Sequence, residues 1–338
     1  MRINAVGIDL AKNVFQLHGA DAQGRPVLRK ALPRIKLLDF FAKLPPCLVG
    51  MEACSTAHYW ARELMAFGHE VKLMPPQYVK PYVKTNKNDA ADAEAICEAL
   101  LRPTMRFVEV KTPDQQVLLL IHREREGAVK DRTALINRLR ATLGEFGIAI
   151  PVGPQRMQRW FRDEYGVVEV RLPELLRRHI SGMRQRLGSL EESLASLDAE
   201  IDQCSRNSEA CKRLETVPGI GRLTASALVA SIGDGRTFNS GRQLAAWLGL
   251  VPKQYSSGGR QRLQGISKRG DAYLRRMLIH GARAVIRHMN PKRTTTVWLT
   301  KLSARAHKNI VIVALANKLA RIAWALLSKG ECYKEVSA

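Results

Sequence analysis

The chain has 338 residues, of which 46% are hydrophobic and 25% charged, a composition typical of globular proteins rather than of disordered or fibrous ones. It carries 54 Lys and Arg residues against 31 Asp and Glu residues, which gives a net charge of +23. An excess of this size is too large for incidental surface charge and indicates a polyanionic partner, usually nucleic acid.

Residues 1–108 alternate strand-like and helix-like segments. Apolar runs bounded by turn residues predict strands. These runs are "AVGIDLAKNVFQLHGAD", which we interpret as two strands with a turn near Lys12, then "QGRPVLRKAL", "PCLVGME" and "HEVKLMPP". A helix is expected to begin near Ser55 or Thr56, where a hydroxyl group can cap it, and "DAADAEAICEALL" has helical composition. The pattern predicts an α/β domain with a mixed sheet.

Residues 109–207 predict a helical arm. Apolar residues there recur alternately four and three positions apart, which is the heptad spacing of a coiled coil. They are Leu176, Ile180, Met183, Leu187, Leu190, Leu194, Leu197 and Ile201, with the shorter upstream series Ile136, Leu139, Leu143 and Phe146. We expect an α-hairpin whose leucines serve packing, and an association of chains if the seam pairs between copies.

Residues 208–330 predict a mostly helical part with Gly-rich turns, followed by a short tail, residues 331–338. Between residues 260 and 308 Asp271 is the only acidic residue among many Lys and Arg residues. Because these cations alternate with apolar residues at helical spacing, they favour a surface that contacts a phosphate backbone. A solvated charged face is the alternative.

Four acidic residues in the N-terminal part are candidates for a metal site. Asp9 lies inside the run "VGIDLAK" with apolar residues on both sides, which predicts that it is buried in a strand, and Glu52 ends another apolar run. Asp89 and Asp92 share one helix face at positions i and i+3. A buried carboxylate is costly unless it is paired or binds a metal. Carboxylates that converge at a sheet edge suit Mg²⁺ or Mn²⁺, although Asp9 could also cap a turn and Asp89 a helix.

These segments resemble the DEDD transposases of the IS110 family of insertion sequences. "GIDLAK", "GMEACSTAHYWARELMAFGHEV" and "KTNKNDAADAEAI" resemble its RuvC-like, RNase H-like domain. "VPGIGRLTASALVASIGD" and "LGLVPKQYSSGG" with "ISKRGDAYLR" resemble its C-terminal transposase domain. The likeness implies a fold of α/β plus all-α type: a RuvC-like domain over 1–108, a coiled-coil arm over 109–207 and a transposase domain over 208–330.

The resemblance also implies the chemistry. Asp9, Glu52, Asp89 and Asp92 become the ligands of Mg²⁺ or Mn²⁺, and a serine of "YSSGG" becomes the nucleophile. Ser257 fits the family pattern best, and Ser256 is second because the serine is doubled. Attack on DNA would leave a phosphoserine link and a 3′ hydroxyl, with the active site completed between protomers of a dimer or tetramer. The family is guided by a structured RNA from the element, called the bridge RNA.

Other residues are expected to contact nucleic acid. Around the Gly-Ile-Gly turn of "VPGIGRLTASAL" the sequence resembles a helix-hairpin-helix element that holds a phosphate, although a plain turn fits equally well. The expected contacts are Lys80, Lys84 and Lys87 near the metal site, Gly219 and Gly221 in the turn, and Arg260, Arg262, Lys268 and Arg269 near the serine.

Two other functions use the same residues. A RuvC-type nuclease would use the four acids with water as the nucleophile, and a non-catalytic scaffold would make the acids structural. The six cysteines form no CxxC pair, and neither a signal peptide nor an uninterrupted membrane span of roughly 18 residues is evident. We therefore expect a bacterial protein that is cytoplasmic, associated with the nucleoid and not bound to a membrane.

Overall fold

A computed structural model describes residues 2–84, 88–288 and 294–334. The chain forms two compact units. Unit 1 comprises residues 1–113 with 235–239, and unit 2 comprises residues 114–234 with 240–338. The prediction of a mixed α/β sheet at the N-terminus followed by a mostly helical remainder is confirmed.

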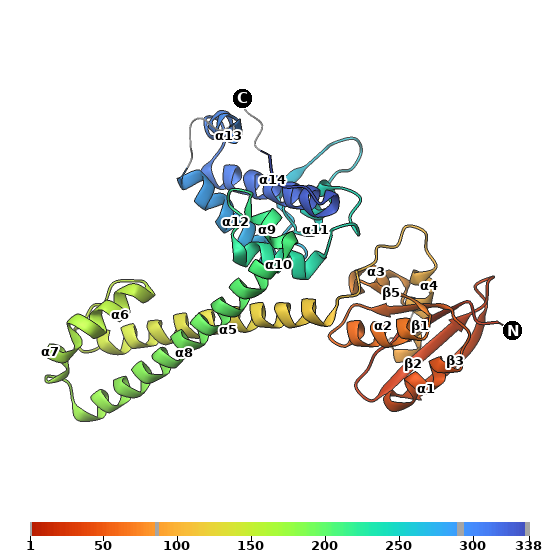
Figure 1. The fold of residues 1–338 in the computed structure, drawn as a ribbon, viewed down its shortest axis with the longest axis horizontal. Helices are drawn as coiled ribbons and strands as arrows, with labels where there is room; N and C mark the ends of the chain where they lie inside the picture. Colours follow the sequence, from red (N-terminus) through yellow and green to blue (C-terminus); the bar gives the residue numbers. More distant parts are fainter. Residues whose placement is uncertain (1, 85–87, 289–293, 335–338) are drawn as a thin grey trace. The chain divides into compact units, whose positions relative to one another are not determined.

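Unit 1 is built on a five-stranded sheet with the strand order β3-β2-β1-β4-β5 (Figure 1). The three N-terminal strands form an antiparallel meander, whereas β4 and β5 run parallel to β1 and to each other. The strands are β1 (Ala5–Asp9), β2 (Val14–Ala20), β3 (Pro26–Pro33), β4 (Leu48–Glu52) and β5 (Glu70–Met74). All five predicted strands are therefore present.

Helices cover both faces of this sheet. On one face Ile8, Val49 and Leu73 pack against α1 (Leu37–Ala42) and α2 (Ala57–Ala66). On the other face lies α4 (Asp89–Leu100), whose Ile96 and Leu100 pack with Ala5 and Met74. The short elements are η1 (Arg34–Lys36), α3 (Pro76–Val79) and η2 (Lys80–Tyr82).

Two helices begin where the sequence predicts, but their capping differs from the expectation. Thr56 is the N-cap position of α2, but its side chain makes no capping hydrogen bond. Asn88 caps α4, because its Oδ1 accepts a hydrogen bond of 2.8 Å from the backbone nitrogen of Ala91. Asp89 is thus the first helical residue and not the cap, which leaves its carboxylate available for another role.

The first part of unit 2 is formed by two long helices, α5 (Pro113–Gly144) and α8 (Glu174–Asn207), with α6 (Pro154–Asp163) and α7 (Tyr165–Glu169) at their far end (Figure 1). Ile180, Met183 and Leu187 of the heptad series pack into one core with Leu139 of α5 and Trp160 of α6. The expectation for Phe146 is wrong. It follows the end of α5 and is 49% exposed.

The rest of unit 2 is a helical bundle with one small hairpin. The helices are α9 (Glu209–Glu215), α10 (Arg222–Ile232), α11 (Gly241–Trp247), α12 (Ala272–Arg287), α13 (Thr294–Ser303) and α14 (Lys308–Lys329). The hairpin joins β6 (Pro252–Gln254) to β7 (Leu263–Ile266).

Helix α14 is long and apolar enough to cross a membrane. However, one of its faces is buried, through residues such as Leu315, Leu319 and Ala323. The helix packs against α9, α11, α12 and α13 within the bundle. We therefore interpret α14 as the core helix of unit 2, with half of its apolar window buried inside the bundle.

Candidate metal centre and nucleic-acid interface

Asp9 is the last residue of β1, at the carboxyl end of the central strand. Side chains alternate between the two faces of a strand. Val6 and Ile8 point into the core under α1 and α2, so Gly7 and Asp9 belong to the face that carries α4. Asp9 is half-buried and not fully buried as expected, because β1 ends there.

Helix α4 approaches β1 very closely at Gly7. A Cβ atom on Gly7 would lie 2.5 Å from the carbonyl oxygen of Ala93 and 2.5 Å from the backbone nitrogen of Cys97. Only glycine leaves room for this contact. The close approach carries the first turn of α4, with Asp89 and Asp92, to the end of β1 where Asp9 lies.

The three aspartates come together. Asp9, Asp89 and Asp92 each offer a carboxylate oxygen, and these three oxygens all lie within 4.8 Å of one another. Two of the residues are half-buried and Asp89 is exposed, so the group is open to a ligand on one side. A cluster of hard oxygen donors of this kind fits Mg²⁺ or Mn²⁺.

Glu52 lies nearby but is not a member of this group. It ends β4, which runs parallel to β1 with Met51 opposite Ile8. Strand alternation assigns Glu52 to the same face as Gly50, where a Cβ atom would lie 2.9 Å from Leu100 of α4. Glu52 thus ends the strand next to that of Asp9 on the same face of the sheet, and its role as a fourth ligand stays a prediction.

The lysines expected near the metal centre are only partly described. Lys80 begins η2 and is exposed. The ammonium of Lys84 lies 2.6 Å from Oε1 of Glu94 in α4, and this hydrogen bond raises the pKa of Lys84. Lys87 lies outside the described residues.

The two candidate serines lie on the exposed hairpin of unit 2. The backbone nitrogen of Arg260 donates a hydrogen bond of 3.0 Å to the carbonyl oxygen of Ser257. Between them Gly258 and Gly259 have φ values of 56° and 75°, the signature of a tight type I′ turn. The sequence predicted Gly-rich turns in this part of the chain, but it did not predict the flanking strands β6 and β7.

The two hydroxyls differ in their surroundings. Oγ of Ser256 lies 2.9 Å from the side-chain nitrogen of Gln254, which donates to it. The hydroxyl of Ser257 makes no hydrogen bond within the described part of the chain. Ser257, at the first position of the turn, is therefore the freer nucleophile, and its activation has to come from outside the hairpin.

Four predicted phosphate contacts surround this hairpin. Arg260, Arg262, Lys268 and Arg269 are all exposed, and none of them forms an ion pair among the residues that the structure describes. Arg275 of α12 holds the turn that carries Lys268 and Arg269 in place. The guanidinium of Arg275 donates to the carbonyl oxygens of Leu248 and Arg269, at 3.0 Å each.

The Gly-Ile-Gly turn joins α9 to α10, as the predicted helix-hairpin-helix element requires. Gly219 has a φ of 93° and is packed against α12, where a Cβ atom on Gly281 would lie 1.9 Å from the Gly219 carbonyl oxygen. Gly221 is exposed at the N-cap of α10, where backbone N–H groups can receive an anion.

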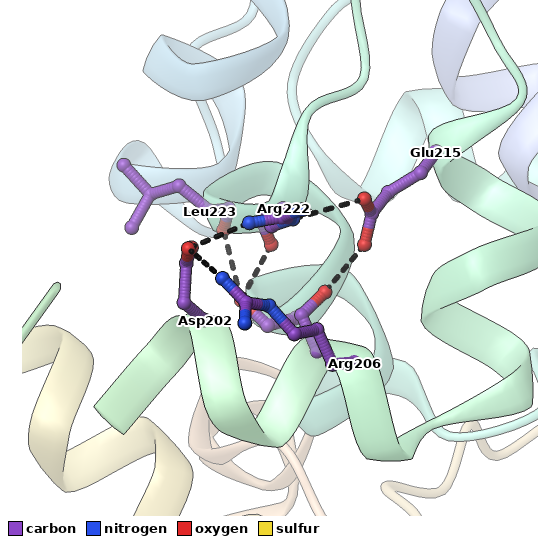
Figure 2. Close-up of polar contacts among 7 residues, drawn as sticks. Asp202, Arg206, Glu215, Arg222 and Leu223 are labelled. Atoms are coloured by element: carbon purple, nitrogen blue, oxygen red, sulfur yellow. Dashed lines mark hydrogen bonds and ion pairs between the residues drawn. The ribbon is translucent and has the colours of Figure 1, made fainter. Parts of the chain in front are cut away.

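An ion-pair cluster lies directly beside this turn (Figure 2). Arg222, the first residue of α10, reaches Asp202 of α8 at 2.7 Å and Glu215 of α9 at 3.5 Å. Oγ of Ser205 donates a hydrogen bond of 2.6 Å to Glu215. The cluster fixes the turn to the end of the long helix α8, a connection that no sequence spacing predicted.

A buried polar network connects three helices of unit 2, and no sequence pattern predicted it. His122 of α5 is 2% exposed and lies between Tyr273 of α12, 3.0 Å from Nδ1, and Ser226 of α10, 3.1 Å from Nε2. Burial, reinforced by the charge of Arg125, lowers the pKa of His122 to about 4. A neutral His122 therefore ties α5 to α10 and α12. The three residues are far apart in the sequence, so no local signal could have found them.

Comparisons with known proteins cover both units. A family model described as a transposase with the DEDD motif of IS110 elements matches residues 6–148 and contains the four acids. A model described as the transposase IS116/IS110/IS902 family matches residues 211–297 and contains both serines. The DEDD match suggests dependence on a divalent metal, in agreement with the carboxylate cluster.

Whole-length relatives give the same result. A probable family 20 transposase from Pseudomonas aeruginosa is 51% identical over 99% of both chains. The transposase for insertion sequence element IS1328 from Yersinia enterocolitica is 43% identical over 98% of this chain and 99% of its own. The transposase for insertion sequence element IS1111A from Coxiella burnetii is 42% identical over 98% of this chain and 92% of its own.

Proposed function

Because the chain belongs to the IS110/IS116/IS902 family of transposases, we propose that it excises and inserts an insertion-sequence element through a covalent phosphoserine link to DNA. The observation that carries the proposal is the convergence of three carboxylates from β1 and α4 in unit 1, in a chain that also presents an exposed Ser257 on unit 2.

The carboxylates are proposed to hold Mg²⁺ or Mn²⁺. The fold supports this role, because a mixed sheet with acids at the end of its central strand agrees with the RNase H-like, RuvC-like domain that the resemblance implies. Asp9, Asp89 and Asp92 would be the main ligands, and Glu52 from the neighbouring strand the fourth. When bound, the ion would polarise the scissile phosphate and stabilise negative charge on its oxygens.

Ser257 is proposed as the nucleophile. Its oxygen forms a bond to phosphorus while the bond from phosphorus to the 3′ oxygen of DNA breaks, and the 3′ oxygen leaves as a hydroxyl group. One phosphoester bond replaces another. Rejoining to a new 3′ hydroxyl therefore needs no ATP, in agreement with the absence of a GxxxxGK[ST] loop from the sequence.

Basic residues would hold the DNA next to this serine. The exposed guanidinium groups of Arg260 and Arg262 on the hairpin, with Lys268 and Arg269 in the next turn, present unpaired positive charge to a phosphate backbone. The Gly219–Gly221 turn would add backbone N–H groups at the start of α10. Lys80 and Lys84 would serve DNA near the carboxylates.

The guide RNA, the oligomeric state, the role of the helical arm and the cellular location are proposed from the resemblance to the family. We propose that a structured bridge RNA encoded by the element selects the DNA sites, and that dimers or tetramers complete the active site between protomers. The arm of α5 and α8 would act as a coiled-coil domain between the RuvC-like and transposase domains. The protein would work in the bacterial cytoplasm, at the nucleoid.

A test uses Mg²⁺, the element's RNA and labelled target DNA. Wild-type protein is expected to yield a covalent protein–DNA adduct, with the link mapped to Ser257 by mass spectrometry. Ser257→Ala should abolish both the adduct and DNA cleavage, whereas Ser256→Ala should retain them. Cleavage that persists without an adduct in Ser257→Ala would instead establish a nuclease that uses water. Cleavage that persists in Asp92→Asn would remove the metal site from the reaction.

A further inference from the structure

Unit 2 contains a hollow that the proposed chemistry does not use. It has a volume of about 1360 Å³ and lies between α11, the base of the β6–β7 hairpin, α13 and α14. A pocket for a single small ligand is usually about 300–1,000 Å³, so this hollow has room for more than one such group. We call it the α14 groove.

One face of α14 forms the length of this groove. Ile310, Val313, Ala314 and Asn317 line it, and the same stripe continues to Ala325. At a rise of 1.5 Å per residue the stripe is about 22 Å long. The opposite face of α14 is buried in the bundle, whereas the groove face combines apolar residues with Asn317, Lys318 and Arg321.

Two tryptophans give the groove aromatic walls. Trp298 of α13 is 37% exposed and Trp324 of α14 also lines the hollow. The ammonium of Lys318 lies 4.8 Å from the centre of the Trp298 ring. Trp298 is exposed beside this cation and Trp324 is half-buried, and an accessible indole ring next to a cation is a surface on which nucleobases stack.

The charge of the groove is positive. Its lining includes Arg242, Lys318 and Arg321 and no acidic residue, and none of these cations forms an ion pair in the described part of the chain. An occupant has to combine flat apolar groups with negative charge.

The groove also adjoins the serine hairpin. Pro252 of β6 and Ile266 of β7 line it, and Ser257 follows Pro252 by five residues. A chain of five residues spans at most about 17 Å, which equals about five base steps of DNA. A DNA strand whose phosphate lies at Ser257 could therefore reach the groove with nucleotides close to the cleavage point.

We propose that the α14 groove binds unpaired DNA bases next to the cleavage point, stacked on Trp298 and Trp324 with their phosphates on Arg242 and Arg321. The choice of DNA as occupant rests on the proposed function, since that function puts a DNA strand at Ser257. The groove would favour a locally opened duplex, because a base inside the helix cannot reach an indole ring.

The test compares two DNA ligands of equal length, one fully paired and one with a short single-stranded gap. Binding is followed by fluorescence anisotropy with the full chain in EDTA, where metal-dependent cleavage does not occur. Wild-type protein should prefer the gapped DNA by about fivefold to a hundredfold, the range that one stacked base supplies. Trp298→Ala should lower this preference by about fivefold or more, although Trp324 remains, and Trp298→Phe should retain most of the preference.

A second variant covers the case in which Trp298→Ala does not fold. Ile310 is 59% exposed on the groove, so Ile310→Asp adds a negative charge there without opening a core, and it should also lower the preference. Val152→Asp is the matched control, because Val152 is 77% exposed in the loop before α6 and lies outside the groove. It should bind both DNA ligands like wild type.

Three results would overturn the proposal. Equal affinity of the wild-type protein for the two DNA ligands would show that the groove does not recognise unpaired bases. A loss of affinity in the variants for gapped RNA alone would make RNA the occupant. A change in the sedimentation coefficient of the variants alone would make a second copy of the chain the occupant. The binding test is done without metal and does not depend on cleavage. A failure of adduct formation at Ser257 would therefore refute the proposed function without changing the outcome of the binding test.

Discussion

A Cβ atom on Gly7 would lie 2.5 Å from the backbone nitrogen of Cys97, so β1 and α4 can meet at this distance only where residue 7 lacks a side chain. The same contact aligns Asp9 at the end of β1 with Asp89 and Asp92 at the start of α4. Gly7 offers no ligand, but it allows the close contact of β1 and α4 that brings the three carboxylates together.

Gly7→Ala is predicted to damage this cluster. The added methyl group overlaps the backbone of α4, so the helix has to move away, at a cost of about 1–3 kcal/mol or more in the free energy of unfolding. Wild-type protein should gain thermal stability when Mn²⁺ is added, because a bound ion stabilises the folded state. The variant should lose this gain.

Gly127→Ala provides the matched control. Gly127 lies within α5, and a Cβ atom there would meet nothing within 4 Å. Replacing glycine by alanine inside a helix should raise stability by about 0.5–1 kcal/mol, with the Mn²⁺ effect unchanged. An equal Mn²⁺ response in Gly7→Ala and wild type would contradict the role of the close contact.

The His122 network predicts a loss of stability in acid. The pKa of His122 is lowered from 6.5 to about 4 in the folded protein, so the unfolded chain binds the proton more readily between these values. The contribution of neutral His122 to the free energy of unfolding is fully present above pH 6.5 and is lost as the pH falls toward 4. At about 1.4 kcal/mol per pKa unit, the total loss is about 3 kcal/mol. Urea denaturation on both sides of pH 6.5 measures this loss.

His122→Gln should be less stable than wild type at neutral pH and should show a weaker dependence on pH. Some dependence should remain, because burial also lowers the pKa of His58 in unit 1 to about 4. His179→Gln is the control, since His179 is exposed on α8. An unchanged acid profile in His122→Gln would show that the network does not couple to folding.

The cluster in Figure 2 predicts a gain of DNA affinity. Asp202→Asn removes a carboxylate that holds Arg222 at 2.7 Å beside the Gly219–Gly221 turn. If the turn contacts a phosphate, the guanidinium, which then keeps only its 3.5 Å contact with Glu215, should add one phosphate contact. Affinity should then rise at low salt, and the slope of log affinity against log salt should steepen by about one.

Asp198→Asn serves as the control for this change. Asp198 lies four residues before Asp202 on the same helix, and it pairs with Arg125 of α5 and not with Arg222. The variant should leave the salt slope near the wild-type value. Equal slopes for both variants would assign the Gly219–Gly221 turn to packing alone, in agreement with its contact to Gly281.

The sequence predicted the local parts of this protein well. Strand alternation at Val6 and Ile8, and the i, i+3 spacing of Asp89 and Asp92, are local signals that determine which face a side chain takes. These signals sufficed for the five strands of the mixed sheet and for the shared helix face of Asp89 and Asp92.

Contacts between distant segments were not predictable in the same way. The role of Gly7 depends on the path of α4, and the bonds of His122 to Tyr273 and Ser226 depend on how three helices cross. The strands beside Ser257 were missed because β6 and β7 are short and exposed, so they carry no apolar alternation. The position of Glu52 relative to the three aspartates also depends on side-chain conformation.

The most direct test of the metal centre, on which the proposed reaction depends, is crystallography of the full chain with DNA and Mn²⁺, with data collected for anomalous scattering. We predict a manganese peak within coordination distance of carboxylate oxygens from Asp9, Asp89 and Asp92, and its loss in Asp92→Asn. A map with no peak between these carboxylates, from crystals that retain DNA cleavage, would contradict the account.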